Sequence, residues 1–231
     1  MQTTLEGIFF FQSNTFSKKY FMEYISMNIK NLTGRISFIS GVILLAIGFA
    51  GCEADDPQKE DVPELITKVT LTFTPDVAGD AVVVTATDPD GMGLLPTDVD
   101  GSIDLLKNTS YTLTIEMINE LAEVSDPAHD ITGEVREEGD EHLFYFSWTN
   151  NVFSDPDGDG NVDSRSDDVN YEDEDENGLP VGLTSSWSTP DVASSGAFHV
   201  LLKHQPGLKS ETSASTAGET DLDLLFEINI E

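Results

Sequence analysis

The chain has 231 residues, with 43 acidic and 11 basic side chains and a formal net charge of −32 at pH 7. Such a charge repels nucleic acid, so we expect no nucleic-acid partner. Cys52 is the single cysteine, which excludes an intramolecular disulfide and any metal site built from several thiolates.

Residues 27–51 have the organisation of a bacterial lipoprotein signal peptide. Lys30 and Arg35 precede an apolar stretch at 36–49, which is followed by small residues and then Cys52. A membrane-spanning helix needs about 20 apolar residues, whereas this stretch has 14 and includes serines and glycines. The order of basic, apolar and small residues is that of an export signal, and the end of the stretch resembles the bacterial lipobox. We predict that Cys52 is the lipidated first residue of the mature protein. The alternative is an ordinary signal peptide with an incidental cysteine.

The segments on either side of this signal differ in character. Residues 1–26 do not fit ahead of a signal peptide, and a start at Met27 gives an ordinary basic n-region, so we interpret 1–26 as an over-long start. Residues 52–64 are acidic, interrupted by prolines and poor in apolar side chains, which is typical of a flexible tether. Acidic residues directly after the cysteine resemble the surface-export signal of Bacteroidota lipoproteins. We therefore expect an outer membrane lipoprotein, on the periplasmic face or at the cell surface.

The mature part, 52–231, is long enough for one self-sufficient core. Its 180 residues carry seven basic and 41 acidic side chains, hence a formal charge of −34. A domain of this size buries roughly 70% of the surface that its extended chain would expose. Because no thiolate remains after Cys52, any metal site in the folded part has to be built from oxygen ligands. We expect a cation, a basic protein patch or a neutral glycan as partner.

Residues 65–231 show the two-residue alternation of half-buried strands and almost no helical periodicity. We interpret 130–137 as a polar edge strand, and 142–148 as a central strand because it is apolar on both faces. One helical turn is possible at 119–123. The expected strands are 65–74, 81–88, 102–106, 111–117, 130–137, 142–148, 181–187, 196–205 and 221–230. About eight or nine strands joined by turn signals predict an all-β fold, an antiparallel β-sandwich of the Ig-like or jelly-roll-like kind, with an acidic insert at 154–178.

The domain resembles a family of small lipoproteins from marine Bacteroidota, most of which carry the label "type 1 periplasmic binding fold". The matching phrases lie within 66–75, 141–146, 171–178, 180–183, 199–204 and 218–227. The label names an α/β fold with parallel sheets and many helices, which the strand pattern cannot supply. No activity is established for the family, so the resemblance implies class and habitat only. Residues 155–163 look like an addition to the family pattern.

That addition is the best candidate for a ligand site. Carboxylates at positions 1, 3 and 5 of a loop, glycine at position 6 and a further acid at position 9 form the first part of a calcium-binding loop. The bidentate acid at position 12 is missing, because Ser166 stands there, although Asp167 and Asp168 follow. We predict a Ca²⁺ site, against the alternative of an unliganded acidic loop. Its ligands would be Asp155, Asp157, Asp159, Asn161 and Asp163.

Two shorter segments repeat part of this pattern. Residues 88–93 keep two of the carboxylates and lose the third to Met92, so we favour a plain turn. Residues 173–178 match more positions, but they end in Asn177-Gly178, a strong hairpin signal, and Leu179-Pro180 follow where ligands should lie. We favour a hairpin there.

Catalysis has little support in the sequence. His199 and His204 are five residues apart on one expected strand, hence on opposite faces, and do not form a metal pair. The sequence has no nucleophile elbow, no zinc-protease motif and no phosphate loop, so we predict that the protein is not an enzyme. The favoured hypothesis is a non-catalytic envelope lipoprotein that serves as a binding or accessory module. The alternatives are a calcium-dependent adhesion or glycan-binding domain, with Trp148 or Trp187 stacking on a sugar, and a hydrolase with a carboxylate pair. Both tryptophans are more typical of a core.

Overall fold

The computed structural model describes residues 64–91 and 96–231. The predicted tether, signal peptide and lipidated Cys52 therefore lie outside the described residues, apart from Glu64. The strands are β1 (Lys68–Pro75), β2 (Val82–Thr87), β3 (Asp98–Asp100), β4 (Ile103–Leu105), β5 (Ser110–Ile118), β6 (His142–Trp148), β7 (Asn170–Tyr171), β8 (Thr184–Ser188), β9 (Ser194–His204) and β10 (Glu219–Ile230). The helical segments are η2 (Pro127–His129) and α2 (Ile131–Glu137).

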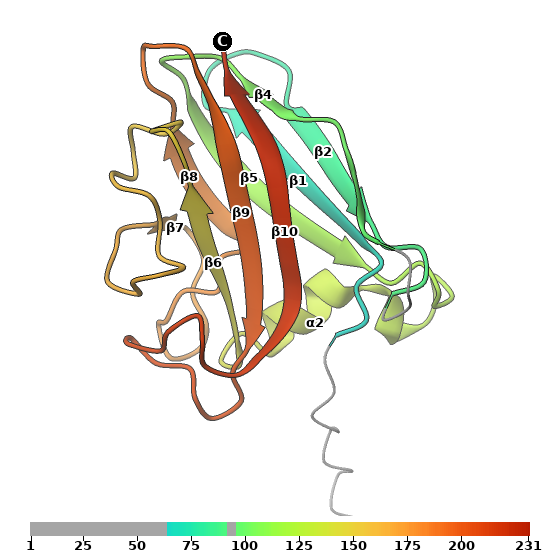
Figure 1. The fold of residues 1–231 in the computed structure, drawn as a ribbon. Coiled ribbons are helices and arrows are strands. Elements are labelled where there is room, and N and C mark those ends of the chain that lie inside the picture. The colour runs from blue at the N-terminus through green and yellow to red at the C-terminus, as the bar shows by residue number, and fades with distance from the viewer. Residues whose placement is uncertain (1–63, 92–95) are drawn as a thin grey trace, which may run out of the picture. The chain divides into compact units, whose positions relative to one another are not determined.

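These strands form two sheets, which confirms the predicted all-β sandwich (Figure 1). One sheet has six strands in the order β3-β2-β1-β5-β8-β7, and the other has four in the order β4-β10-β9-β6. Nearly all strand pairs are antiparallel, but β4 pairs with β10 in parallel. The strand β10 is thus paired on both sides, with β9 and with β4. No helix among the described residues is long and apolar enough to cross a bilayer.

The core lies between the two sheets because alternate side chains of each strand point inward. In β10 these are Leu222, Leu224, Phe226, Ile228 and Ile230, and in β1 they are Val69, Leu71 and Phe73. Aromatic rings from both sheets meet at the centre, where Trp187 of β8 lies 5.2 Å from Phe198 of β9 between ring centroids. Burial of one such side chain contributes about 1.5–3 kcal/mol, so the many buried apolar side chains between the sheets together stabilise their packing.

The prediction of an edge strand at 130–137 is wrong, because this segment forms the helix α2. Asp130 caps it, with Oδ1 accepting a hydrogen bond from Gly133 N at 2.9 Å. Ile131 and Val135 are buried and four residues apart, which places them on one helix face. The same two residues also fit an alternation of period two, so over seven residues the pattern did not distinguish the structures. Thr132 then joins α2 to β5, because Met117 N donates to Thr132 Oγ1 at 2.6 Å.

The prediction of a central strand at 142–148 is also wrong, because β6 lies at the edge of its sheet. One face of β6 packs into the main core, and the other forms a small second cluster with Leu201. The second face is covered by the loop at 205–217, where Tyr145 Oη donates to Ser213 O at 2.7 Å and Gln205 Nε2 donates to Tyr145 Oη at 3.2 Å. A covering loop, and not a second neighbouring strand, explains the apolar sequence on both faces.

Candidate functional site

The acidic loop 154–163 forms main-chain hydrogen bonds with β8 of one sheet and with β6 of the other. At its start, Ser188 N on β8 donates to Asp155 O at 2.7 Å. Further along, Trp148 N on β6 donates to Asp159 O at 2.9 Å. These main-chain bonds cover the free edge of β6, which would otherwise expose unpaired amide and carbonyl groups. The loop is therefore fixed in place at both ends, and its carboxylates project from a held backbone.

Asn161 is the main attachment of this loop and is fully buried. Its Oδ1 accepts from Phe146 N at 3.0 Å, and its own N–H donates to Phe146 O at 2.8 Å. Its Nδ2 donates to Tyr171 Oη at 2.8 Å, and that hydroxyl donates to Phe144 O at 2.5 Å. Burial raises the pKa of Tyr171, so the hydroxyl stays protonated as this donor requires. Gly160 has φ +95°, and a Cβ there would collide with the carbonyl of Phe146.

The structure gathers two of the five predicted calcium ligands. Asp159 and Asp163, together with Asp167, place carboxylate oxygens within 4.8 Å of one another, and all three residues are exposed. We call this set the carboxylate cluster. The calcium-loop pattern has its last acid at position 12, which is Ser166 in this chain, and Asp167 is the next residue. The three-dimensional course of the loop, and not the spacing of the sequence motif, therefore determines which acid is the third member of the carboxylate cluster.

The other predicted ligands are placed differently. Asp155 Oδ1 accepts a hydrogen bond from Asn170 Nδ2 at 3.0 Å. Asp157 does not belong to the carboxylate cluster. The side-chain amide of Asn161 is occupied by its bonds to β6 and Tyr171. The structure therefore brings together three side-chain ligands, those of the carboxylate cluster, and not the predicted five.

The two partial repeats form turns, as favoured from the sequence. After β2, Asp90 N donates to Asp88 Oδ1 at 3.4 Å in a turn that ends at Gly91. The segment 173–180 forms a hairpin, with Glu174 opposite Pro180 and Gly178 at φ +76°.

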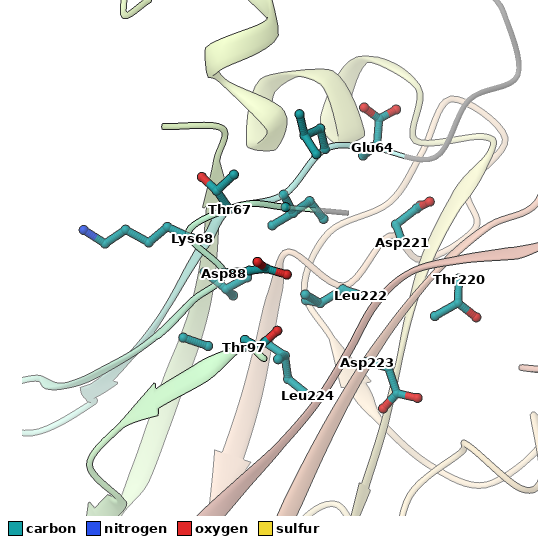
Figure 2. Close-up of a pocket in the computed structure, with 15 residues that line it drawn as sticks. Glu64, Thr67, Lys68, Asp88, Thr97, Thr220, Asp221, Leu222, Asp223 and Leu224 are labelled. Atoms are coloured by element: carbon teal, nitrogen blue, oxygen red, sulfur yellow. The ribbon is translucent and has the colours of Figure 1, made fainter. Parts of the chain in front are cut away.

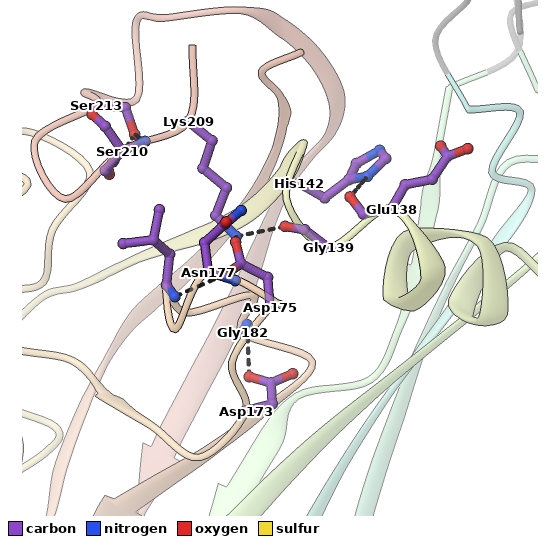
Figure 3. A network of polar contacts seen from close by, with 11 residues as sticks. Glu138, Gly139, His142, Asp173, Asp175, Asn177, Gly182, Lys209, Ser210 and Ser213 are labelled. Atoms are coloured by element: carbon purple, nitrogen blue, oxygen red, sulfur yellow. Dashed lines mark hydrogen bonds and ion pairs between the residues drawn. The ribbon is translucent and has the colours of Figure 1, made fainter. Parts of the chain in front are cut away.

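A buried ion pair anchors that hairpin (Figure 3). Lys209 Nζ lies 2.9 Å from Asp175 Oδ2, and both side chains are 1% exposed. The same ammonium donates to Gly139 O at 2.6 Å, so it joins three loops. Burial opposes ionisation of Asp175, but Lys209 and the backbone amides of Leu179 and Asn177 outweigh it and lower the pKa of this carboxyl. Burial in turn lowers the pKa of Lys209.

Asp173 in the same hairpin is a structural acceptor. Its Oδ1 accepts from Gly182 N and its Oδ2 from Leu183 N, both at 2.8 Å. Burial raises its pKa, and these amides oppose the shift. Asp173 and Asp175 thus hold the hairpin together, with their oxygens directed at protein donors.

Both tryptophans belong to the core, in agreement with the simpler interpretation. Trp148 is 2% exposed and Trp187 is 1% exposed. The two rings contact edge to face, 5.2 Å apart between centroids. Neither can stack on a sugar without unfolding the sandwich, so the version of the glycan hypothesis that uses these rings is wrong.

One of the pockets among the described residues opens where β1, β2 and β10 meet (Figure 2). Its volume is about 190 Å³, below the roughly 300–1,000 Å³ of typical small-molecule sites. Figure 2 shows Glu64, Asp88, Asp221 and Asp223 among its lining side chains. The size and the acidic lining suit an ion with a few waters better than an organic ligand.

The histidines occupy separate places in the fold. His199 lies on the outer face of β9, with Nε2 2.7 Å from Asp223 Oδ1. His204 faces inward at the end of β9 and stacks on His142, with ring centroids 4.6 Å apart and an angle of 4°. Their neighbour Asp221 has a pKa raised to about 6 by burial, which His204 and the backbone amide of Glu64 partly offset. The sequence could not pair His142 with His204 because the order of the strands was unknown.

No protein-family model, no curated protein and no solved structure matches this chain. The resemblance to marine Bacteroidota lipoproteins therefore stays a prediction, and the function has to be argued from the residues and the geometry described above.

Proposed function

We propose that the chain from Cys52 onward is a non-catalytic lipoprotein of the outer membrane, and that its β-sandwich is a binding or accessory module stabilised by calcium. The anchor is proposed from the sequence order of basic, apolar and small residues before Cys52. The calcium role rests on one observation, the convergence of Asp159, Asp163 and Asp167 in a loop whose backbone is fixed to β6.

The distances in the carboxylate cluster suit calcium. Ca²⁺ binds oxygen at about 2.3–2.6 Å, so two oxygens on one ion are at most about 5 Å apart. The ligand atoms of Asp159, Asp163 and Asp167 lie within 4.8 Å of one another. Without a cation, three carboxylates at this spacing repel each other. A dication removes this repulsion, while backbone carbonyls and water can complete the shell.

The position of the loop explains how calcium would act. Because Asn161 and Gly160 attach the loop to β6, an ion bound beside them would stabilise the edge of the four-stranded sheet. Such an ion is a structural element and not a reagent. The strongly negative surface around it favours cationic partners such as basic protein patches. The lipid would hold the module at the membrane while this surface meets an envelope partner.

We predict that calcium raises the melting temperature of the mature protein. A site of this exposed kind binds with a Kd of about 10⁻⁴–10⁻³ M. At ten to a hundred times that concentration the gain is about 1.4–2.7 kcal/mol, which corresponds to roughly 3–10 °C for a domain of this size. The measurement is a thermal melt of the mature chain carrying Cys52→Ser, in chelator and in about 10 mM calcium, which is ten to a hundred times this Kd.

The structure supplies matched controls for this experiment. Asp163→Asn removes a member of the carboxylate cluster, whereas Asp157→Asn removes an equal charge from the same loop outside the cluster. We expect the calcium shift to vanish in the first variant and to persist in the second. Equal shifts in both variants, or no shift in the parent protein, would contradict the calcium proposal and show that the loop is an unliganded acidic segment.

A further inference from the structure

Three neighbouring strands bring two histidines and an aspartate together at one end of the four-stranded sheet. His142 is the first residue of β6, and His204 is the last residue of β9, directly opposite it in the register. Asp221 lies near the start of β10. The ring of His142 is fully buried, His204 is 6% exposed, and the side chain of Asp221 is fully buried. One nitrogen or oxygen atom from each residue lies within 4.8 Å of the others.

A β-bulge turns Asp221 into this group. β10 pairs Thr220 with Lys203 and Leu222 with Leu202, so Asp221 has no partner of its own in β9. Bulges of this kind re-aim a side chain. In the regular part of the strand Asp223 points outward and its side chain is 66% exposed. Asp221 should point the same way by alternation, yet its side chain is 0% exposed. The bulge therefore places a carboxylate inside the sandwich.

Protein donors satisfy the buried carboxylate only in part. The backbone amide of Glu64 counteracts the raised pKa of Asp221, but neither carboxylate oxygen accepts a hydrogen bond with good geometry from the described residues. His142 Nε2 lies 3.7 Å from Oδ2, which is beyond hydrogen-bond distance. Burying a carboxylate in this way is costly unless it is neutralised by a proton, by a close ion pair or by a metal. The separation leaves room for an ion between the two atoms.

Each histidine ring has an oxygen acceptor beside one of its nitrogens. His142 Nδ1 donates to Glu138 O at 3.0 Å (Figure 3), because a carbonyl can only accept. In the neutral ring this places the lone pair on Nε2, the nitrogen that faces Asp221 and lies 4.0 Å from Glu64 Oε1. His204 Nε2 lies 3.3 Å from Glu141 Oε2. Metal-binding histidines usually have such an oxygen acceptor on the other ring nitrogen, which fixes the tautomer.

We propose that His142, His204 and Asp221 bind a first-row transition metal ion, with Zn²⁺ as the best match and Glu64 as the fourth ligand. Zinc binds imidazole and carboxylate at about 2.0–2.1 Å in a tetrahedron, so its ligands lie about 3.3 Å apart. The observed 3.7 and 4.0 Å around His142 Nε2 exceed this by well under 1 Å. Because the two rings are stacked with an angle of 4°, loading also rotates at least one ring out of the stack.

Charge and access support the same assignment. Asp221 and Glu64 carry two negative charges on side chains that are 0% and 7% exposed, and one divalent ion balances both. Both residues line the pocket at the end of β10 (Figure 2), which gives an ion a path to the site. Nitrogen ligands favour zinc over calcium. The site is independent of the carboxylate cluster and of the calcium role proposed for it.

Zinc itself is the probe for this site. The mature chain carrying Cys52→Ser, which removes the competing thiol, is titrated with zinc in millimolar calcium, so that the carboxylate cluster is occupied. We expect one zinc ion per chain and an X-ray absorption spectrum with two imidazoles at about 2.0–2.1 Å. Loss of even an outer-shell partner typically weakens a metal site by about 10–100-fold. We therefore expect His204→Gln and Asp221→Asn each to weaken binding by about 100-fold or more.

His199→Gln is the matched control, because it removes a histidine of the same strand that is paired with an aspartate of the same neighbouring strand. This variant should keep the zinc. The X-ray absorption spectrum is recorded on the zinc-loaded parent protein, so it tests the proposal even if a substituted chain does not fold. An oxygen-only shell, no stoichiometric zinc, or equal losses in His199→Gln and His204→Gln would each overturn the proposal.

Discussion

Asp175→Asn is expected to destabilise the protein by about 3–5 kcal/mol at neutral pH, because breaking a buried ion pair leaves an uncompensated charge. The amide can still accept the backbone bonds of Asn177 and Leu179 through its oxygen. What is lost is the partner of the Lys209 ammonium, whose side chain is 1% exposed. The free energy of unfolding of a domain is only about 5–15 kcal/mol, so this loss is a large part of its stability. Urea unfolding of the parent and the variant measures it.

The pH dependence identifies the charge as the cause. The folded state lowers the pKa of Asp175, so its contribution is present above the unfolded value, near 3.9. It disappears as the pH falls through the depressed native value. The difference between the parent and Asp175→Asn should therefore be constant at neutral pH and should shrink in strong acid. A difference that does not change down to the lowest pH at which the protein stays folded would contradict this explanation.

A double-mutant cycle with the single variants Asp175→Asn and Lys209→Met and the double variant Asp175→Asn/Lys209→Met measures the coupling between the two side chains. Removal of both charges leaves no buried ion, so the double variant should be clearly more stable than the sum of the two single losses predicts, by about 0.5–3 kcal/mol. Glu176→Gln, an exposed acid in the same hairpin, should change stability by no more than about 0.5 kcal/mol. Additive single losses would show that the two side chains act separately.

Trp187→Ala is expected to lower the free energy of unfolding by about 3–5 kcal/mol, because buried apolar surface is lost and a cavity is left behind. The ring is 1% exposed, and its centroid lies 4.6 Å from that of Phe153 and 5.5 Å from that of Phe146. Its Nε1 donates to Ser185 Oγ at 2.8 Å, so no donor is left unpaired in the parent protein. The measurement is chemical unfolding monitored by the remaining tryptophan, Trp148.

Two controls separate the core role of Trp187 from a role in binding. Trp187→Phe keeps an aromatic ring and should lose much less stability than the alanine variant. Val192→Ala, at a side chain that is 66% exposed in the loop after β8, should be close to neutral. If Trp187→Ala were as stable as the parent, the ring would not be the centre of the core described here.

The strands were predictable where one face is buried and the other is exposed to solvent. β10 is the clearest case, since Leu222, Leu224 and Phe226 alternate with exposed polar neighbours such as Asp223. The helix α2 was missed because its buried residues, Ile131 and Val135, fit both a helix and a strand. β6 was placed at the centre of a sheet because the loop that covers its outer face is distant in the sequence. Local periodicity records burial but not what causes it.

The sites show the same limit. The sequence placed acids at 155–163, but the carboxylate cluster includes Asp167, because the path of the chain and not the spacing decides which acids meet. The proposed zinc site could not be predicted from the sequence. His142, His204 and Asp221 are separated by 62 and 17 positions, and they meet only through strand order and a bulge. Neither feature has a local signature in this chain.

Intact mass spectrometry of the protein extracted from bacterial membranes tests most directly whether the β-sandwich is held at a membrane by a lipid on Cys52. We predict a polypeptide that begins at Cys52, with the added mass of the lipid on that residue, and a Cys52→Ser variant that is neither acylated nor retained in the membrane. A mature protein that begins at another residue, or an unmodified Cys52 in the membrane fraction, would contradict it.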